Sequence, residues 1–451
     1  MVNIFSSDVA KPKSNCVRIG IFTYIKWSVF QMLERLSDLL GNNAASHFDI
    51  QFSSVALPSL WVFVSTIGEL NAIDPLLKVL IQRLKNLKLI LITDHVHYRE
   101  SYKERYPNAE VCVTRGHSGD AIELSFIYPP QLLIVGEVPC WPSDAPCRFS
   151  FAFLLEAKRH GAFACIINGW LYHYSPSCRM DSIERKLFQQ DYLCAFDVIA
   201  VQTDEVRTHL LNAGAPIERI GVTGNLKFDA ISKLDWSPNQ ARSPIMLASL
   251  LEAKRPIIVA GCVTEYTEQN LLLDALMEVR VIYPEVLLVL APRHPEFSER
   301  MQALSKILYK RQILSLFRST VLDSKIPSEI SCLVLDSIGE LRDFYAVAHI
   351  AHVGRNHNVL EPLAFEKPVT VNSGWEVTYP SYPVYRMALD SKCVLEVETE
   401  SGLGAQWIQL LDNPTTYVSH QILVRNMLTK AQGAIERHIS LLNPYLEQLM
   451  Y

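Results

Sequence analysis

The sequence lacks the features that mark several large classes of protein. No window of about 18 or more residues is uninterruptedly apolar, so no transmembrane helix is predicted. The ten cysteines are scattered and form no CxxC pair, so neither a zinc site nor a disulfide framework is indicated. The net charge of -5 argues against a nucleic-acid-binding protein, because neutralising phosphates requires a basic surface. These absences predict a cytoplasmic globular protein with reduced thiols.

The N-terminal region lacks the apolar core of a signal peptide. Residues 18–40 are apolar and aromatic, but Lys26, Glu34 and Arg35 interrupt them. We expect this stretch to form a helix that packs on its domain. The alternative is a helix that lies on a membrane surface, with the protein held peripherally at the inner membrane.

The length of 451 residues exceeds one ordinary domain. From residue 60 onward, short β-rich runs alternate with longer amphipathic runs, which predicts βαβ units on parallel sheets. A polar, proline-containing stretch near residue 235 interrupts the alternation, which then restarts. We expect an α/β protein of the GT-B class, with two Rossmann-like, doubly wound domains facing a central cleft. The predicted parts are an acceptor-binding domain (1–232), a linker (233–243), a nucleotide-sugar-binding domain (244–425) and a C-terminal helix that packs back on the first domain (426–451).

Polar residues follow the predicted strands in both domains, at the edge where open α/β sheets bind ligands. In the first domain they are Ser65, Thr66, Glu69 and Glu137. In the second domain they are Gly261, Thr264, Arg293, His294, Ser337, Glu340 and the segment 355–361. Several such positions at one edge are stronger evidence for a site than a single one.

Arg293 ends an apolar strand in the stretch APRHPEF and precedes a helix expected to begin at Pro295. Its planar, permanently charged guanidinium suits a phosphate, and a nearby helix start adds to the attraction. The alternative is a surface ion pair with Glu296 or Glu299.

Two segments of the second domain have the spacing of a capping box, in which a polar residue precedes a helix and a glutamate follows three positions later. Asn358 and Glu361 form one such pair, and Ser337 and Glu340 form the other. For the first pair a functional interpretation is also open, in which Glu361 accepts hydrogen bonds from ribose hydroxyls. For the second pair the structural interpretation is favoured.

The stretch VTGNLKFDA places a glycine turn, an amide and a lysine directly after a strand. Gly224 permits a tight turn, Asn225 can hold an anion together with backbone amides, and Lys227 can reach a phosphate. The alternative is a lysine that points into solvent. Glu69, at the start of a helix in the first domain, is either a carboxylate that favours the helix dipole or a general base whose pKa is raised by burial.

Several motifs together resemble the bacterial 3-deoxy-D-manno-octulosonic acid (Kdo) transferases, which are GT-B enzymes. VTGNLKFD is close to a signature of that family, and the other similar stretches follow in the family's order over residues 20 to 430. They are WVFVSTIGE (61–69), GEVPCWPS (136–143), AVQTDEV (200–206), APRHPE (291–296), GELRDFYAVAHIAHVG (339–354) and HNVLEP (357–362).

The resemblance implies a role for each matching residue. Glu69 matches the family's catalytic base, and Glu137 matches its second cleft carboxylate. The residues implied to bind the nucleotide and its phosphates are Asn225, Lys227, Arg293, His294, Gly354, Asn358 and Glu361. The chain departs from the family at Phe63, where histidine is usual, and at Trp170, where arginine is usual. Its GRNHN segment is also shorter than the family's glycine-rich loop.

The resemblance further implies inverting transfer of Kdo, or a related ulosonic acid, from a CMP-sugar to a hydroxyl of a lipid A precursor or another glycan. The CMP-sugar is the donor substrate, and we expect no cofactor, no metal and no nucleic-acid partner. Two alternatives remain open at this point: a GT-B transferase that uses another nucleotide-sugar, and a catalytically inactive GT-B protein that binds a glycan.

Overall fold

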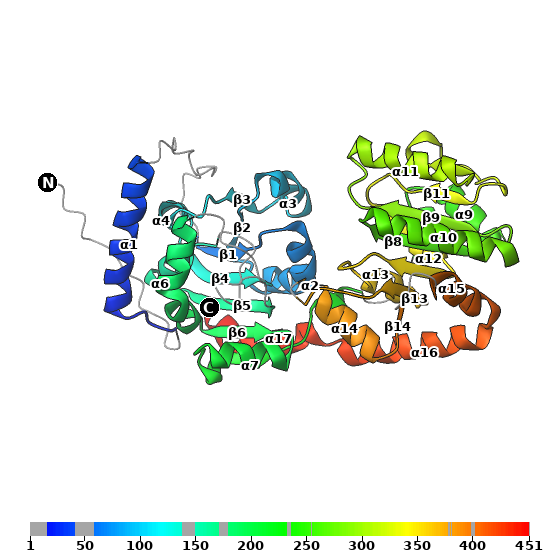
Figure 1. The fold of residues 1–451 in the computed structure, drawn as a ribbon. Helices are drawn as coiled ribbons and strands as arrows, with labels where there is room; N and C mark the ends of the chain where they lie inside the picture. The colour runs from blue at the N-terminus through cyan, green and yellow to red at the C-terminus, as the bar shows by residue number, and fades with distance from the viewer. Residues whose placement is uncertain are drawn as a thin grey trace. The chain divides into compact units, whose positions relative to one another are not determined.

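The structure, a computed structural model, describes residues 16–40, 58–137, 149–170, 179–231, 236–253, 255–377, 379, 381–397 and 402–450. The part of the predicted GEVPCWPS motif beyond Glu137 lies outside these residues. The chain separates into two compact units, each built on one seven-stranded sheet (Figure 1). The first unit comprises Met1–Ala230 and Ala431–Tyr451, and the second unit comprises Ile231–Lys430.

All strand pairs in the first unit are parallel. Its strands are β1 (Ser59–Phe63), β2 (Lys88–Thr93), β3 (Glu110–Val113), β4 (Pro130–Gly136), β5 (Phe163–Gly169), β6 (Val198–Val201) and β7 (Ile220–Val222). Their order in the sheet is β3-β2-β1-β4-β5-β6-β7, so the order reverses between β1 and β4. Every residue of β1 and of β5 is buried, as expected for a parallel sheet that helices cover on both faces.

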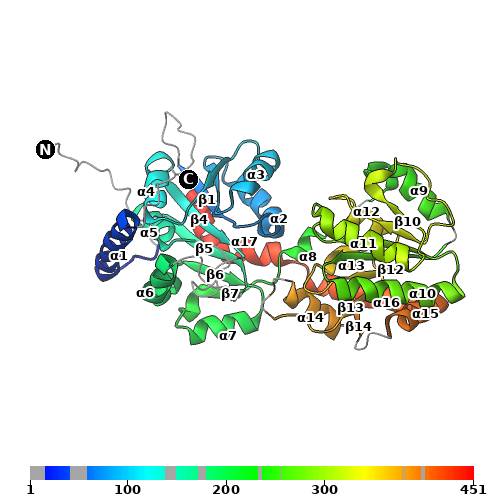
Figure 2. The ribbon, with the colours of Figure 1, turned by 45° about the horizontal axis from the view of Figure 1, so that its top comes forward.

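Helices cover both faces of this sheet (Figure 2). One apolar core lies under α1 (Ile21–Leu40), α4 (Ser118–Ile127), α5 (Phe151–Arg159), α6 (Arg179–Ala195) and α7 (Asp204–Asn212). The other core lies under α2 (Ile67–Arg83), α3 (Arg99–Arg105) and α17 (Ala434–Leu446). The remaining short elements are α8 (Lys227–Ala230), η1 (Val96–Tyr98), η3 (Ile217–Arg219) and η7 (Glu447–Leu449).

The second unit repeats this plan with its own parallel sheet. Its strands are β8 (Ile257–Val263), β9 (Leu287–Pro292), β10 (Ser315–Phe317), β11 (Cys332–Val334), β12 (Ile350–Val353), β13 (Val369–Asn372) and β14 (Val394–Val397). Their order is β10-β11-β9-β8-β12-β13-β14, which reverses between β8 and β12. Its helices are η4 (Pro238–Gln240), α9 (Pro244–Glu252), α10 (Tyr266–Ile282), α11 (Ser298–Lys310), η5 (Arg318–Thr320), α12 (Leu341–Val347), α13 (Leu360–Ala364), α14 (Tyr382–Asp390), α15 (Leu403–Asp412) and α16 (Pro414–Ala431).

The two doubly wound sheets confirm the predicted α/β class. In each unit the strand order reverses once, and sheets of this kind bind ligands at the carboxyl ends of the strands beside that reversal. The residues that follow β1, β4, β8 and β12 are therefore the first places to look for a site.

Candidate functional site

Glu69 lies in the first turn of α2, directly after β1. The Oγ1 atom of Thr66 accepts a hydrogen bond from the Glu69 amide at 3.3 Å, and Glu69 Oε2 accepts hydrogen bonds from the amides of Ser65 (2.6 Å) and Thr66 (3.3 Å). This is a complete capping box, and it fixes the carboxylate at the strand-to-helix turn. The structural interpretation of Glu69 is thus observed, and it leaves the functional one open.

The environment of Glu69 favours its protonated form. The residue is 5% exposed. Burial, followed by the negative charge of Glu137, raises its pKa from 4.5 to about 8, although the amides of Ser65 and Thr66 act in the opposite direction. A carboxylate with a pKa near working pH suits a general base, because it can both gain and lose a proton there.

Glu137 follows β4, the strand next to β1, and is buried with a φ of 56° in the left-handed region. The Nζ atom of Lys227 lies 2.6 Å from Glu137 Oε1, and Asn168 Nδ2 donates to the same oxygen at 3.5 Å. Lys227 therefore points neither into solvent nor at an open anion site in this structure. It forms an ion pair with the second carboxylate of the predicted site.

Asn225 shapes the turn that carries Lys227. Its Nδ2 donates to Gln202 Oε1 at 2.8 Å, and its Oδ1 accepts from the Lys227 amide at 3.0 Å. Gly224, with a φ of 82°, takes the left-handed conformation that the sequence predicted for it. The side chain of Asn225 is 6% exposed, so its contacts lie inside the protein.

The C-terminal helix α17 also supports this turn, through a residue that the sequence analysis did not identify. His438 Nε2 accepts from the Asn168 amide at 3.1 Å, and its Nδ1 donates to the Ala434 carbonyl at 2.7 Å. Burial is the first cause that lowers the His438 pKa to about 4, so the imidazole is neutral. Asn168 in turn accepts from the Leu226 amide at 2.9 Å through Oδ1.

The second unit contains a cavity of about 350 Å³ at the ends of its central strands. This volume suits a small ligand. The cavity lies where the strand order reverses, because its lining follows β8, β9, β12 and β13. It is lined by Thr264, Glu265, Thr267, Glu268, Leu271, Arg293, Arg355, Asn356, His357, Asn372, Ser373, Glu376, Tyr379 and Val397.

Arg293, the predicted phosphate-binding residue, lines this cavity, as do Thr264 and residues 355–357 of the other polar positions that the sequence placed at the strand ends. Its Nη1 lies 3.3 Å from His357 Nε2, whereas Glu296, the ion-pair partner considered from the sequence, contacts His294 Nδ1 at 3.0 Å. Burial, and then the charge of Arg293, lower the His357 pKa to about 4, so this imidazole is neutral beside the guanidinium. The expected helix start at Pro295 was wrong, because α11 begins at Ser298.

Gly354 lies at the base of the segment that enters the cavity. A Cβ atom at this position would lie 2.2 Å from the Cys262 carbonyl oxygen, so no larger residue fits this approach of β12 to β8. Residues 355–357 then line the cavity, while Gly354, Asn358 and His294 lie outside its lining.

The predicted capping box of Asn358 and Glu361 was wrong. Helix α13 begins at Leu360 after Val359, and Asn358 Oδ1 accepts from the Leu360 amide at 3.1 Å. The Asn358 side chain donates to Glu361 Oε1 at 3.4 Å, so the glutamate contacts a side chain rather than the backbone. Burial is the main cause that raises the Glu361 pKa. Glu361 does not line the cavity.

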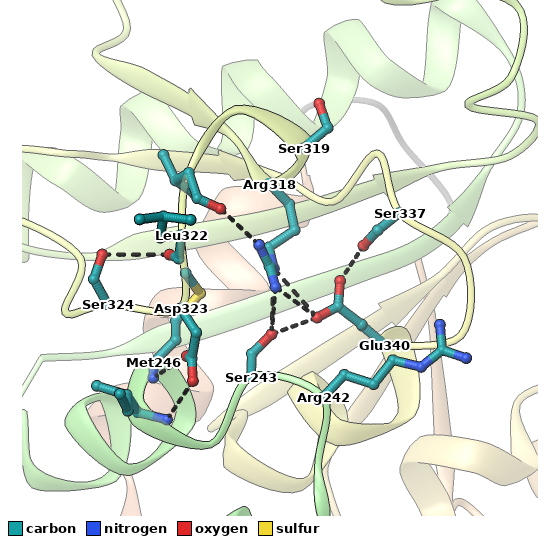
Figure 3. Close-up of polar contacts among 12 residues, drawn as sticks. Arg242, Ser243, Met246, Arg318, Ser319, Leu322, Asp323, Ser324, Ser337 and Glu340 are labelled. Atoms are coloured by element: carbon teal, nitrogen blue, oxygen red, sulfur yellow. Dashed lines mark hydrogen bonds and ion pairs between the residues drawn. The ribbon is translucent and has the colours of Figure 1, made fainter.

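Ser337 and Glu340 do not form a capping box either, because α12 begins at Leu341 and the Ser337 hydroxyl contacts the Glu340 carboxylate. Figure 3 shows the guanidinium of Arg318 donating hydrogen bonds to both this carboxylate and Ser243. Arg318 Nη2 lies 3.1 Å from Glu340 Oε1 and donates to Ser243 Oγ at 2.8 Å. Arg242 adds a hydrogen bond to the Ile338 carbonyl. This cluster fixes the start of α9 and is separate from the cavity.

Sequence reasoning did not place Glu268 in the predicted site, although it lines the cavity and organises its wall. Its Oε1 accepts from the Arg355 amide at 3.3 Å and from Asn372 Nδ2 at 3.2 Å. Burial raises the pKa of Glu268, but His352 and the backbone amides of Arg355 and Thr264 outweigh burial, so the net shift is downward. Within the described parts of the chain, no group of three or more His, Cys, Asp or Glu side chains could hold a metal ion.

Comparison with known sequences identifies relatives of this chain. Residues 34–230 match the family model described as 3-Deoxy-D-manno-octulosonic-acid transferase (kdotransferase). A 3-deoxy-D-manno-octulosonic acid transferase of Haemophilus influenzae is 27% identical over 411 residues, which cover 86% of this chain and 87% of the relative. Its counterpart in Chlamydia trachomatis serovar A is 26% identical over 329 residues, or 69% of each chain.

Solved structures show a similar fold at lower identity. A putative UDP-N-acetylglucosamine 2-epimerase of Listeria monocytogenes has a TM-score of 0.57 and 14% identity, and covers 87% of this chain and 98% of its own. The UDP-GlcNAc 2-epimerase of Neisseria meningitidis, bound to UDP-GlcNAc, has a TM-score of 0.56 and 16% identity, and covers 86% and 100%. These likenesses concern the fold alone, and with the two parallel sheets they confirm the predicted GT-B class.

Proposed function

Because the chain belongs to the 3-deoxy-D-manno-octulosonic acid transferase family, we propose that this glycosyltransferase moves Kdo, or a related ulosonic acid, from a CMP-sugar to a hydroxyl of a lipid A precursor. The observation that carries the proposal is the similarity to the Haemophilus influenzae transferase over 86% of this chain. That length includes parts of both units, and so residues of both strand-order reversals.

The proposed reaction is an inverting displacement at the anomeric carbon. The acceptor oxygen forms a bond to this carbon, the bond from the carbon to the phosphate oxygen breaks, and CMP leaves with the electron pair. Glu69 takes the proton of the acceptor hydroxyl, for which its raised pKa suits it. Arg293 stabilises the charge that develops on the leaving phosphate.

Transfer can be tested with the purified protein, CMP-Kdo and a lipid A precursor, with mass spectrometry of the product. We expect the acceptor mass to increase by one or more Kdo residues. Thermal unfolding with CMP, UDP and GDP tests the donor nucleotide separately, and we expect CMP alone to stabilise the protein. Stabilisation by UDP and not by CMP would favour another nucleotide-sugar. CMP binding without transfer to any glycan would favour an inactive binding protein.

We also propose that α1 holds the first unit against a membrane, where a lipid acceptor would lie. One side of α1 is anchored in the core through Trp27 and Phe30, both 1% exposed. The other side presents an apolar row to the solvent, at spacings of three and four residues. This row, the α1 outer face, comprises Ile21, Phe22, Ile25, Val29, Met32, Leu33, Leu36 and Leu39. Interfacial helices bury an apolar face at the boundary of headgroups and acyl chains, and the α1 outer face offers such a surface.

The membrane proposal concerns association and not spanning. Among the described helices, none combines the length and the apolar character needed to cross a membrane. Flotation with vesicles of anionic lipid measures association directly. We expect Phe22→Asp, at a position 83% exposed, to reduce flotation strongly. Val281→Asp, at a position of equal exposure in α10, is the matched control and should float like the wild type. Equal flotation of both variants would overturn the proposal.

A further inference from the structure

The cavity of the second unit contains two guanidinium groups that face solvent. Arg293 and Arg355 both line it and are both exposed. Arg293 contacts the neutral His357, and the hydrogen bond of Arg355 to Glu268 uses the backbone amide rather than the side chain. Among the residues that the structure describes, no ion pair joins either guanidinium to a carboxylate. Two unpaired arginines in the cavity lining therefore remain available to an anion.

The backbone around Arg355 is fixed from several directions. Besides the bond from its amide to Glu268, the next residue, Asn356, has a left-handed φ of 66°. Asn356 Oδ1 accepts from the Glu376 amide at 2.8 Å, and the Asn356 carbonyl accepts from Ser381 Oγ at 2.8 Å. These bonds hold the segment in place while the guanidinium of Arg355 stays exposed. Such an arrangement reduces the entropy lost when a ligand binds.

The guanidinium of Arg355 lies beside Gly374, in the loop after β13. A Cβ atom at Gly374 would lie 3.6 Å from Arg355 Cζ, and the glycine itself has a φ of 83°, which other residues rarely adopt. The side chain of Arg355 thus lies along the backbone of the loop after β13. It reaches the cavity from the side of β12, whereas Arg293 reaches it from the end of β9.

The cavity also carries carboxylates, which limits the ligands that fit. Glu265, Glu268 and Glu376 line the same space, so a simple inorganic anion would meet negative charge as well as the two arginines. A ligand with both anionic oxygens and hydroxyl donors meets both requirements, because hydroxyls donate to carboxylates. A nucleotide-activated sugar acid has this character: its phosphate and its sugar carboxylate are two separate anions.

We propose that Arg355 binds the carboxylate of the donor's sugar acid, while Arg293 binds the phosphate. This assignment rests on the proposed function and adds to it a residue that determines specificity. Arg355 thereby selects sugar acids over neutral sugars attached to the same nucleotide. Because CMP itself has no sugar carboxylate, the two arginines contribute to different parts of the ligand and can be separated by measurement.

Calorimetric titration of CMP and of CMP-Kdo, without acceptor, tests the assignment. We expect Arg355→Gln to weaken CMP-Kdo binding by about 10- to 100-fold and to change CMP binding by less than about twofold, since a bond between two charged groups is lost only for the sugar acid. Arg293→Gln should weaken both ligands. Arg355→Lys should recover part of the loss, because it keeps the charge but not the bidentate geometry. Arg300→Gln, at an exposed arginine of α11 outside the cavity lining, is the matched control.

The outcomes separate this inference from the proposed function. Loss of CMP and CMP-Kdo affinity by equal factors in Arg355→Gln would overturn the assignment, and so would unchanged affinity for both. In either case the wild type would still bind both ligands, and the proposed function would stand. A wild-type protein that binds neither CMP nor CMP-Kdo would overturn both. Thermal unfolding of each variant verifies that the second unit remains folded.

Discussion

The two units differ in the environment of the polar residues that follow their central strands. In the first unit the polar groups at the strand-order reversal are buried and held by their own unit: Glu69 is 5% exposed and accepts from two backbone amides, and Glu137 is 1% exposed and paired with Lys227. In the second unit the corresponding groups line an open cavity, in which Arg293 and Arg355 have no carboxylate partner among the described residues. The same sheet topology therefore supports buried, internally bonded carboxylates in one unit and an open cavity in the other.

The difference follows from what covers each reversal point. In the first unit, α17 returns to the sheet from the end of the chain, and His438 holds the backbone of Asn168 beneath Lys227. This helix contributes Leu442 and Leu446 to the core on that face. In the second unit, the residues after β8, β12 and β13 bond to each other around the rim of the cavity instead. In the first unit the polar side chains are therefore bonded within the fold, whereas in the second unit they surround an open cavity.

The largest expected effect comes from replacing Glu69, the proposed general base of the first unit. Glu69→Gln keeps the shape of the side chain but cannot take a proton, so we expect transfer to fall by about 100- to 10,000-fold. Affinity for CMP should stay at the wild-type value, because Arg293 and the cavity belong to the other unit. Single-turnover kinetics and calorimetry measure the two quantities. A wild-type rate in this variant would exclude Glu69 as the base.

The next effect concerns the ion pair between Lys227 and Glu137 in the first unit. Lys227→Met leaves the buried Glu137 without its cation, and we expect the free energy of unfolding to fall by about 2 kcal/mol, less than for a fully buried pair because Lys227 is partly exposed. Adding Glu137→Gln should recover part of this loss, because the uncompensated charge is then gone. Chemical denaturation of both single variants and the double variant gives the coupling energy. Additive losses would show that the pair does not stabilise the fold.

The pH dependence of kcat/KM and of stability tests the proposed role of Glu69 in the first unit. Glu69 must be ionised to act as a base, so kcat/KM should rise by about tenfold between pH 7 and pH 9, as expected for a pKa near 8. The folded pKa lies above the unfolded one, so the stability that this proton contributes is present at low pH and is lost as the pH rises through about 8. Glu137→Gln removes a neighbouring negative charge and should move the midpoint of the kcat/KM profile to lower pH. A profile that is flat between pH 7 and pH 9 would contradict this assignment.

Much of the fold is predictable from local pattern. The continuous apolar runs of β1 and β5 are buried along their whole length, and a buried parallel strand has this signature. Glu69 and Glu137 could be found because each directly follows such a strand, so the topology brings them to one edge. Arg293 was found for the same reason, and it does line the cavity.

The remaining site residues depend on contacts between distant parts of the chain. His438 lies 270 positions from Asn168, and no local pattern connects them. Glu268 holds the amide of Arg355 from 87 positions away, which only the folded sheet brings about. The capping box of Ser337 and Glu340 failed for a related reason: Ser243 and Arg318, which are distant in the chain, contact the Glu340 carboxylate that the local spacing assigned to the backbone.

The smallest expected effect concerns a strand end of the second unit at which side chains of the same unit contact a buried carboxylate. Glu340 follows β11, is 4% exposed and is held by Ser243, Ser337 and Arg318 (Figure 3). Burial raises its pKa, but these partners outweigh burial and the net pKa is lowered. We expect Glu340→Gln to reduce the free energy of unfolding by about 1 kcal/mol at pH 7 and to leave CMP affinity unchanged.

The direction of the pH effect distinguishes an electrostatic contribution of the Glu340 carboxylate to stability from a contribution of its packing. Because the folded pKa of Glu340 lies below its unfolded value of 4.5, the stabilisation is present above that pH and is lost as the pH falls through the folded value. The difference in unfolding temperature between wild type and Glu340→Gln should therefore shrink as the pH falls from 7 to below 4.5. A constant difference across this range would mean that Glu340 acts through its shape alone. In that case the contacts of Glu340 in the second unit would stabilise the fold by packing, unlike the Lys227–Glu137 ion pair of the first unit.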